Sequence, residues 1–534
     1  MKRLGIVVLL CLSIVLSGFT VYSANAEPPV KPVAGGTLQL PLDGDVNSLD
    51  PVLFTTAGER AIIPALFDTL MIYDQTTGAL DYGLARGIQV SKDGKVFRIT
   101  LRKGVLFHHG RALTAEDVKF SFDRAANPAT GSAAVSLLSA VEGAEVLAGG
   151  NAANGLSGVR VVDPYTIQIN LSQPSMFFFT ILAEPALSIV PKDLVTKDPA
   201  GFGRIPRGTG PFKLGEFGPQ RIRLLKNDQY WQSGLPYLAS ITWTRYNTAK
   251  AIYDAFTTYE TDLINLDPQY LDLLSKRGSW NKTMQTWPEL TTFYFGFNMQ
   301  KPPFDRPEVR RAVLLTVNAA AYLGLHGGAG EVANGVLPPG IGGHNPQRQR
   351  PVRNLKEAAN LISKAGYPGG RGMPPIKISA GSMSGLQKQL LELVKADLET
   401  LGFKVQIEQI DPDKYDQYVA SGQTNMFSYG WTADYPDPHN FMFNLFHSSQ
   451  IGATNLTGYK NAQVDKLIDQ AREERDPLKR LTLYQNIEDQ IAKEVPMIPT
   501  FHPAAVRAFQ SWVKGNSIHP VIPLFYAQMW LDKR

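Results

Sequence analysis

One stretch of the chain places aromatic side chains around a single carboxylate. It reads Tyr429-Gly430-Trp431-Thr432-Ala433-Asp434-Tyr435. A carboxylate among aromatic rings suits a water-poor cleft, where it needs a cationic partner such as an ammonium group, because an unpaired buried charge is costly. The stretch therefore predicts that Asp434 recognises a cation. A structural interpretation competes with this one: Asp434 caps a local turn or helix, and Trp431 belongs to the core.

Other residue patterns give no chemistry of comparable strength. His439 and His447 stand eight positions apart, which fits no compact metal motif, so they are expected to be ordinary loop residues. Gly381-Ser382-Met383-Ser384-Gly385 has Met383 where a nucleophile elbow requires serine. Gly327-Gly328-Ala329-Gly330 lacks the spacing of a dinucleotide loop, and no Walker sequence is present. The sequence predicts a protein without catalysis, metal or cofactor.

The elements that would position the aromatic stretch alternate between strand and helix. Residues 354–365 predict a helix, and Ile376–Ala380 predicts a strand. A second helix follows, capped by Ser384 and ended by Gly402, before a strand over Phe403–Ile410. Strand, helix and strand in this order predict a parallel βαβ unit.

Further elements are indicated on both sides of this unit. Thr37–Leu40 begins a strand, and residues 85–102 form a hairpin signal around the turn Lys92-Asp93-Gly94. Thr114 is placed to cap a helix. Pro477–Ala492 predicts a long helix close to the C-terminal tail.

Length and composition set the class of protein. The chain has 534 residues, too many for one compact core, so two or three domains are expected. Hydrophobic residues make up 44% and charged residues 19%, which is a globular composition. The formal net charge is +5, which becomes +3 once Lys2 and Arg3 leave with the leader described next. So small a charge argues against a nucleic-acid partner.

The N-terminus carries the pattern of an export signal. Lys2 and Arg3 form a basic head before the apolar run Gly5–Leu16, which is too short to span a bilayer comfortably. Ala24-Asn25-Ala26 fits the small-x-small cleavage pattern. Residues 1–26 are therefore predicted to be a signal peptide cleaved after Ala26, although an uncleaved N-terminal helix is the alternative.

Cysteine usage indicates how the exported chain would behave. Cys11, the only cysteine, lies inside the apolar run, so the mature chain would have no disulfide. Leu16-Ser17-Gly18 resembles the start of a lipoprotein box, but Phe19 stands where the lipidated cysteine would be. We therefore expect a soluble periplasmic protein without a lipid.

A series of short motifs, in a fixed order, resembles the peptide/nickel-binding family of ABC-importer solute-binding proteins, often called family 5. Each motif alone is weak, but the ordered series is specific. It comprises Ser48-Leu49-Asp50-Pro51, Leu66-Phe67-Asp68-Thr69-Leu70, Ser91-Lys92-Asp93-Gly94, Leu101-Arg102-Lys103-Gly104-Val105-Leu106-Phe107-His108-His109-Gly110, Leu113-Thr114-Ala115-Glu116-Asp117-Val118, Gly208-Thr209-Gly210-Pro211-Phe212-Lys213, Asn227-Asp228-Gln229-Tyr230-Trp231, Phe297-Asn298, Pro303-Phe304-Asp305, Val309-Arg310-Arg311-Ala312 and Trp431-Thr432-Ala433-Asp434-Tyr435-Pro436-Asp437-Pro438. His109 and Val317-Asn318 depart from the family's usual Asp and Ile-Asp.

The resemblance implies an α/β, two-lobed periplasmic-binding-protein fold with hinged lobes, an extra subdomain and mixed sheets flanked by helices. Residues 27–75, 205–290 and 501–534 would form lobe I, with residues 76–204 as its inserted subdomain, and residues 291–500 would form lobe II. Ligand would bind in the crevice between the lobes.

The same resemblance assigns residues to the ligand site. In peptide binders of the family, the aspartate matching Asp434 takes the peptide's α-amino group, within the stretch Tyr429–Tyr435. Phe54, Thr55 and Thr56 lie in a loop that lines the pocket in similar proteins, although an ordinary surface loop is an equal alternative. Dipeptide-specific members use an arginine that residues 381–386 lack, which leaves longer or non-peptide ligands open.

The function implied is capture of an extended organic solute, most readily a peptide, and its delivery to a cognate ABC permease by a monomeric protein. A nickel chelate, an oligosaccharide or an opine-like compound is the alternative ligand. A secreted hydrolase acting on peptides or glycans is the rival from another class. A chaperone-like or receptor role for the same fold stays open.

Overall fold

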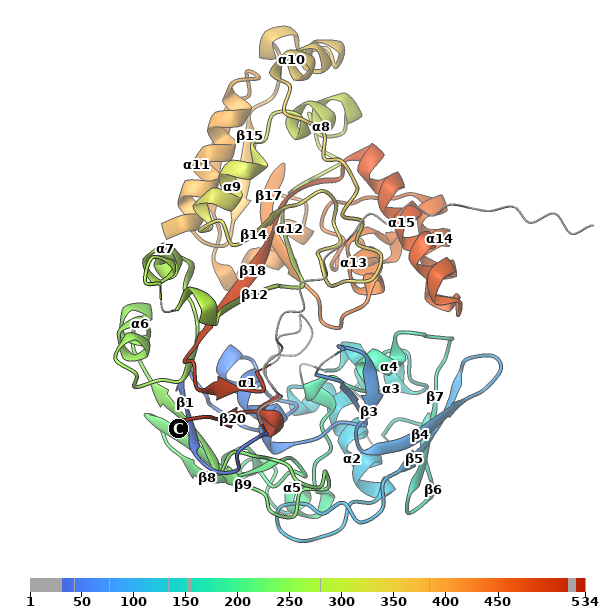
Figure 1. Ribbon diagram of the computed structural model, residues 1–534. Coiled ribbons are helices and arrows are strands. Elements are labelled where there is room, and N and C mark those ends of the chain that lie inside the picture. The colour runs from blue at the N-terminus through green and yellow to red at the C-terminus, as the bar shows by residue number, and fades with distance from the viewer. Residues whose placement is uncertain are drawn as a thin grey trace, which may run out of the picture.

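The computed structural model describes residues 31–533 apart from positions 43, 76, 133, 151–154, 279, 384 and 517–524. The predicted signal peptide, with Cys11 and Phe19, lies outside the described residues, as does the predicted cap Ser384. The chain folds into two lobes, one above the other in Figure 1. We call the lobe with two four-stranded sheets lobe I, and the lobe around the large sheet lobe II.

The first sheet of lobe I joins an N-terminal strand to three strands from the middle of the chain. Its order is β1 (Thr37–Leu42), β10 (Ser240–Arg245), β9 (Arg221–Lys226) and β8 (Phe212–Phe217). Strand β1 runs parallel to β10, and the other pairs are antiparallel. Alternate residues Leu38, Leu40 and Leu42 of β1 are buried, as expected for a strand with one face on a core. Helix α1 (Ala57–Leu66) contributes Ile62 and Ile63 to the same core.

The second sheet of lobe I forms a subdomain with its own core. Its order is β4 (Ala85–Val90), β5 (Val96–Leu101), β7 (Thr166–Asn170) and β6 (Val159–Asp163). Phe97 on β5 packs with Phe122 on helix α2 (Ala115–Ala126) in this core. Smaller elements complete lobe I: β2 (Met71–Tyr73), β3 (Leu80–Tyr82), α3 (Ala144–Ala148), α4 (Phe178–Ile181), α5 (Lys192–Lys197), α6 (Ala249–Thr257), α7 (Leu271–Ser275), β19 (Val513–Lys514) and β20 (Trp530–Leu531).

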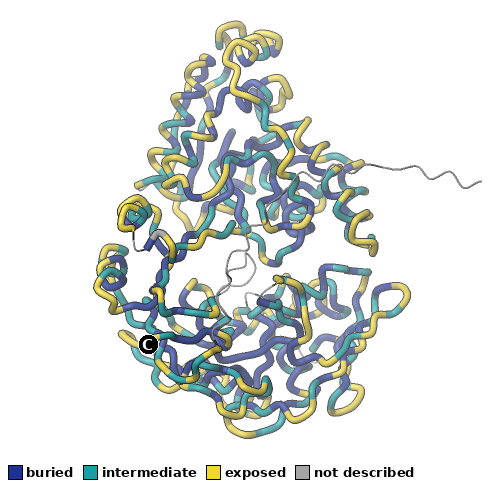
Figure 2. Tube along the Cα trace, in the orientation of Figure 1, coloured by how far each residue is buried: buried dark blue, intermediate teal, exposed yellow. Residues whose placement is uncertain are grey.

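Lobe II is built on a mixed eight-stranded sheet. Its main path is β11 (Leu263–Asn265), β18 (Met497–Phe509), β13 (Thr291–Phe297), β17 (Met426–Thr432), β15 (Ile376–Ala380) and β16 (Val405–Gln409), with β12 (Met284–Pro288) and β14 (Gly330–Val332) also paired to β18. Strands β15, β16 and β17 are parallel, while β13 and β18 pair antiparallel. Figure 2 shows that each lobe has a buried interior of its own.

Strand β18 is shared between the two lobes. Its residues 497–503 pair with β13 and β14, whereas residues 504–509 pair with β11 and β12. The change of partners falls between Pro503 and Ala504. One continuous strand therefore carries the chain from lobe II into lobe I.

Helices cover the large sheet of lobe II. They are α8 (Pro307–Leu314), α9 (Ala319–Leu325), α10 (Leu355–Lys364), α11 (Gly385–Glu399), α12 (Pro412–Ala420), α13 (Pro438–Phe446), α14 (Ala462–Glu473) and α15 (Pro477–Glu494). In Figure 1, α9, α10 and α11 lie toward one end of the sheet and α13, α14 and α15 toward the other.

The sequence predictions for these elements are largely confirmed. Strands β15 and β16 are parallel on either side of α11, which is the predicted βαβ unit, and Gly402 has the positive φ of +87° expected where the helix ends. The hairpin β4–β5 turns at Gly94 with φ +77°. The last helix extends two residues beyond the predicted end, to Glu494. Among the described residues, no helix is long and apolar enough to cross a membrane.

Candidate functional site

Asp434 lies in the loop between β17 and α13, where a buried amide fixes its position. Asn440, on the first turns of α13, donates from Nδ2 to Asp434 Oδ2 at 2.9 Å. The Oδ1 atom of Asn440 accepts from Trp431 Nε1 at 2.8 Å and from the Asp434 backbone N–H at 3.3 Å. Asn440 is fully buried, whereas Asp434 is exposed. The aromatic ring and the carboxylate are thus oriented by one side chain.

The other residues of the predicted stretch are tied to their neighbours. Tyr429 donates its hydroxyl to Asp416 Oδ1 at 2.7 Å, and burial raises its pKa. Gly430 faces Phe293, where an added Cβ would lie 2.9 Å from the ring. Thr432 is exposed, and its hydroxyl lies 2.9 Å from that of Thr291 on β13. Gly430 and Thr432 thus contact β13, whereas Tyr429 ties β17 to α12.

Rings from the two lobes meet beside Asp434. Tyr435 and His439 lie on lobe II, and Phe177, next to α4 of lobe I, stacks on both with centroid distances of 5.0 and 4.3 Å. The stack continues along α13 through Phe443 to His447, because these positions are four residues apart. Burial and the charge of Arg472, Arg480 and His447 hold the pKa of His439 well below its usual value.

The prediction that both histidines are ordinary loop residues is wrong for His439, which lies on α13 and is buried, whereas His447 directly follows that helix. His439 Nδ1 lies 2.9 Å from the Tyr435 hydroxyl, and His447 Nδ1 lies 2.7 Å from Ser449 Oγ. In the described part of the chain, no group of three His, Cys, Asp or Glu side chains is placed to hold a metal ion. His109, the departure from the family motif, stacks on Phe107 and lies 3.5 Å from Asp193.

The predicted loop Phe54-Thr55-Thr56 lies at the start of α1. Thr56 is the N-cap: its hydroxyl accepts from Glu59 N–H at 3.2 Å and donates to the Asp45 carbonyl at 2.7 Å. Glu59 in turn accepts from the N–H groups of Thr55 and Thr56 at 2.8 and 3.1 Å, which completes a capping box. Phe54 is half-buried under the guanidinium of Arg60, 5.7 Å from the ring centroid.

Sequence reasoning missed the carboxylate that lobe I contributes near Asp434. The Glu184 side chain is only 9% exposed and lies 3.7 Å from Arg60 Nη2. Burial raises the pKa of Glu184 to about 7, the positive charge of Arg60 opposes this rise, and the negative charge of Asp434 adds to it. Glu184 of lobe I and Asp434 of lobe II thus act on each other across the boundary between lobes. The sequence feature that could have indicated this residue is that Glu184 is the one charged residue in the apolar segment 176–190.

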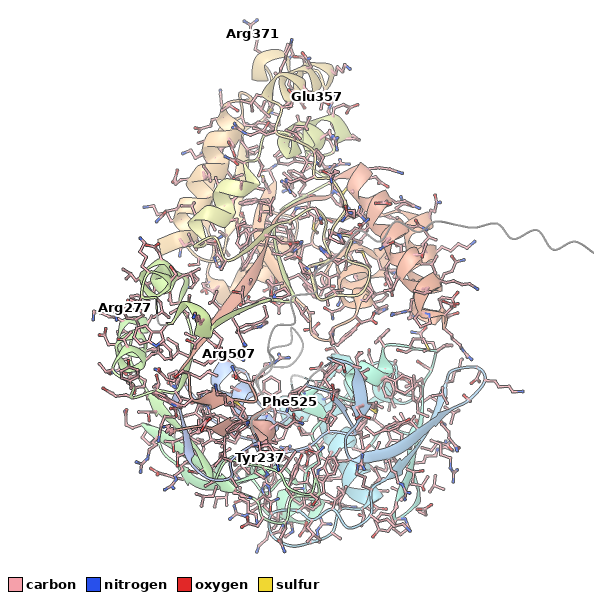
Figure 3. All side chains as sticks on the ribbon, in the orientation of Figure 1. Tyr237, Arg277, Glu357, Arg371, Arg507 and Phe525 are labelled. Atoms are coloured by element: carbon pink, nitrogen blue, oxygen red, sulfur yellow. The ribbon has the colours of Figure 1, made fainter. Side chains whose placement is uncertain are left out.

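A cavity of about 200 Å³ adjoins Glu184 and Arg60 on lobe I. Tyr73, Asp68 and Phe525 also line it. Figure 3 labels Phe525 on the side of lobe I that faces lobe II. A larger cavity, of about 590 Å³, lies between α1, β10 and α6, but neither Asp434 nor Glu184 lines it. Glu184 lines only the smaller of the two cavities, which makes that cavity the better candidate, and Asp434 lines neither.

Comparison with known proteins identifies the class. Residues 79–453 match the model of the bacterial extracellular solute-binding proteins, family 5 Middle. The glutathione-binding protein GsiB of Salmonella typhimurium (strain LT2) is 31% identical over 487 residues, covering 89% of this chain and 90% of that protein. GsiB of Escherichia coli (strain K12) is 29% identical over 483 residues, with the same coverage.

Solved structures agree with this match. HbpA2 from Haemophilus parasuis superposes with a TM-score of 0.82 and 25% identity, over 93% of this chain and all of that one. DppA from Helicobacter pylori, in complex with the peptide STSA, gives a TM-score of 0.75 and 26% identity, over 94% and 99% of the two chains. The fold is that of the two-lobed periplasmic binding proteins. Within that class, the chain belongs to the bacterial extracellular solute-binding proteins, family 5, whose members bind solutes for ABC importers.

The burial of Glu184 generates a prediction about stability. Because the folded-state pKa of about 7 exceeds the ordinary glutamate value of 4.5, the folded protein keeps a proton that the unfolded chain loses as the pH rises from about 4.5 to 7. Stability is therefore lost over that interval. Glu184→Gln imitates the protonated form, so at pH 8 it should raise the free energy of unfolding by about 3 kcal/mol. Near pH 4.5 the gain should largely vanish.

Denaturant unfolding of both proteins at the two pH values measures this difference. Glu357→Gln is the matched control, because Glu357 is exposed at the far tip of lobe II (Figure 3). A gain that was equal at both pH values would show that Glu184 is not desolvated as described.

Proposed function

We propose that this chain is the periplasmic substrate-binding component of an ABC importer and that it captures a peptide between its two lobes. The proposal rests on Asp434, an exposed carboxylate that Asn440 holds in place, while Asn440 itself accepts a hydrogen bond from Trp431. A ligand ammonium brought there by lobe closure would be shielded from water, which strengthens its attraction to the carboxylate. Asp434 would thus take the α-amino group of the peptide.

The relatives support a peptide over the alternative ligands. The GsiB proteins are named for binding glutathione, which is itself a peptide, and DppA was solved with the peptide STSA. These relatives do not favour the alternative ligands, which are a nickel chelate, an oligosaccharide or an opine-like compound. We propose that the protein binds without turnover, acts as a monomer and delivers its ligand to a cognate permease.

We also propose where the molecule divides and moves. Residues 27–75, 205–290 and 501–534 would move as lobe I together with the subdomain 76–204, and residues 291–500 would move as lobe II. The hinge would lie where β18 changes partners at Pro503–Ala504 and where β12 passes into β13 at Glu289-Leu290. A hinge requires only a few residues that absorb the change in backbone angles.

The role of Asp434 is tested with Asp434→Asn, which removes the charge and keeps a group that Asn440 can still bind. The tripeptide Ala-Ala-Ala should bind the variant about 30-fold to several-thousand-fold more weakly, because loss of one partner from a desolvated charge pair costs about 2–5 kcal/mol. Titration calorimetry measures both affinities.

Two controls isolate the charge pair. The N-acetylated tripeptide lacks the ammonium, so it should bind weakly and equally to both proteins. Asp413→Asn changes an exposed aspartate on α12 and should leave the affinity unchanged. If Ala-Ala-Ala bound equally well to wild type and Asp434→Asn, the amino group would not meet Asp434.

Closure of the lobes has its own signature. A ligand that prefers the closed form shifts the population toward it by its differential affinity. Saturating tripeptide should therefore lower the radius of gyration measured by small-angle X-ray scattering. An identical scattering profile with and without bound peptide would contradict hinge closure.

Export is tested by the mature N-terminus. The basic head, short apolar run and Ala24-Asn25-Ala26 place the cut between Ala26 and Glu27. N-terminal sequencing and intact mass of protein recovered from the periplasm should give a chain that starts at Glu27 and carries no lipid. A chain starting at Met1 would overturn the assignment.

A further inference from the structure

The cavity beside Glu184 has an unusual surplus of acidic residues. Four carboxylate side chains and one guanidinium line it: Asp68, Asp74, Asp81, Glu184 and Arg60. Its volume of about 200 Å³ equals roughly seven water molecules of ~30 Å³ each. A space of this size admits one extended side chain but not a whole peptide.

The carboxylates are not equally available to a ligand. Asp68 accepts hydrogen bonds from Thr209, Tyr230 and Trp231 at 2.8, 3.0 and 3.1 Å. Its carboxylate is therefore already hydrogen-bonded within lobe I. Glu184 differs, because no described residue donates a hydrogen bond to its carboxylate. Among the described residues, the one positively charged group paired with it is Arg60, whose Nη2 lies 3.7 Å away on a side chain that is 48% exposed.

A second buried group beside Glu184 lacks a partner. Tyr73 lines the same cavity and is 8% exposed, and its hydroxyl has no hydrogen-bond partner among the described residues. Glu184 and Tyr73 both line this cavity, and burial together with the negative charge of Glu184 raises the pKa of the Tyr73 hydroxyl. A buried polar atom left without a partner is costly, so such an atom is expected to meet a ligand or water.

We propose that this cavity is a subsite for a second positively charged group of the bound solute, a primary ammonium or a guanidinium, with Glu184 as its counter-ion and the Tyr73 hydroxyl as a further polar partner. The inference rests on the proposed function, because Glu184 lines the cavity and interacts electrostatically with Asp434, the residue that would hold the α-amino group. It narrows the ligand to a peptide with a basic side chain.

An organic cation fits the cavity better than a metal ion. The described residues offer no group of three His, Cys, Asp or Glu side chains placed around one point. The acidic residues share the lining of the cavity with the apolar residues Phe525 and Ile72. An alkyl chain that ends in a charged group matches walls of this mixed character.

The experiment compares lysine with methionine, which has a similar length and no charge. Lys-Ala-Ala and Ala-Lys-Ala are titrated against Met-Ala-Ala and Ala-Met-Ala. In the wild type, one lysine peptide should bind at least about tenfold more tightly than its methionine counterpart. Glu184→Gln should abolish this preference, and Glu357→Gln should keep it. Tyr73→Phe should reduce it by a smaller factor, about fivefold.

Other results would overturn the subsite. Equal affinities for lysine and methionine peptides, or a lysine preference that survives Glu184→Gln, would do so while leaving peptide binding itself intact. If no peptide bound, the proposed function would fail, and cadaverine alone would then decide the subsite. Binding of cadaverine that Glu184→Gln weakens would support the subsite, and binding that is absent or insensitive to Glu184→Gln would overturn it.

Discussion

The salt bridge between Asp437 and Arg480 holds the loop on which the site depends. The Nη1 and Nη2 atoms of Arg480 each lie 2.7 Å from a carboxylate oxygen of Asp437, and both side chains are nearly buried. Asp437 also accepts from the His439 N–H at 2.9 Å and so begins α13. Loss of either partner would leave a buried charge, which typically costs ~3–5 kcal/mol. The pair therefore anchors the segment 433–440 to α15.

This anchor explains why exposed and buried groups coexist in so short a segment. Asn440 is one turn into α13, so fixing the start of that helix fixes the amide that orients Trp431 and Asp434. Tyr435 lies in the same anchored segment, and its ring stacks on Phe177 of lobe I. The carboxylate can remain exposed because its neighbours, rather than its own burial, hold it in place.

Local sequence patterns predicted the helices and strands, but they could not predict contacts between segments that lie far apart in the sequence. The βαβ unit around α11 follows from apolar spacing and from Gly402, which are properties of neighbouring residues. Thr56 and Glu59 also have the local spacing of a capping box. The family resemblance instead predicted that the loop containing Thr56 lines the ligand pocket. Glu184 and Asp434 are 250 positions apart, so only the packing of the two lobes reveals that their charges interact.

If the lobes close as proposed, that interaction would give the cleft a preference between open and closed forms. Glu184 and Asp434 belong to different lobes, so bringing the lobes together increases the repulsion between their negative charges and removes water that would screen it. Arg60 offsets part of this repulsion, but its half-exposed side chain is a weak counter-ion at 3.7 Å. A ligand cation placed between the carboxylates turns the repulsion into two attractions. Closure without a ligand is then disfavoured by the same charges that favour closure around a cationic one, which links selectivity to motion.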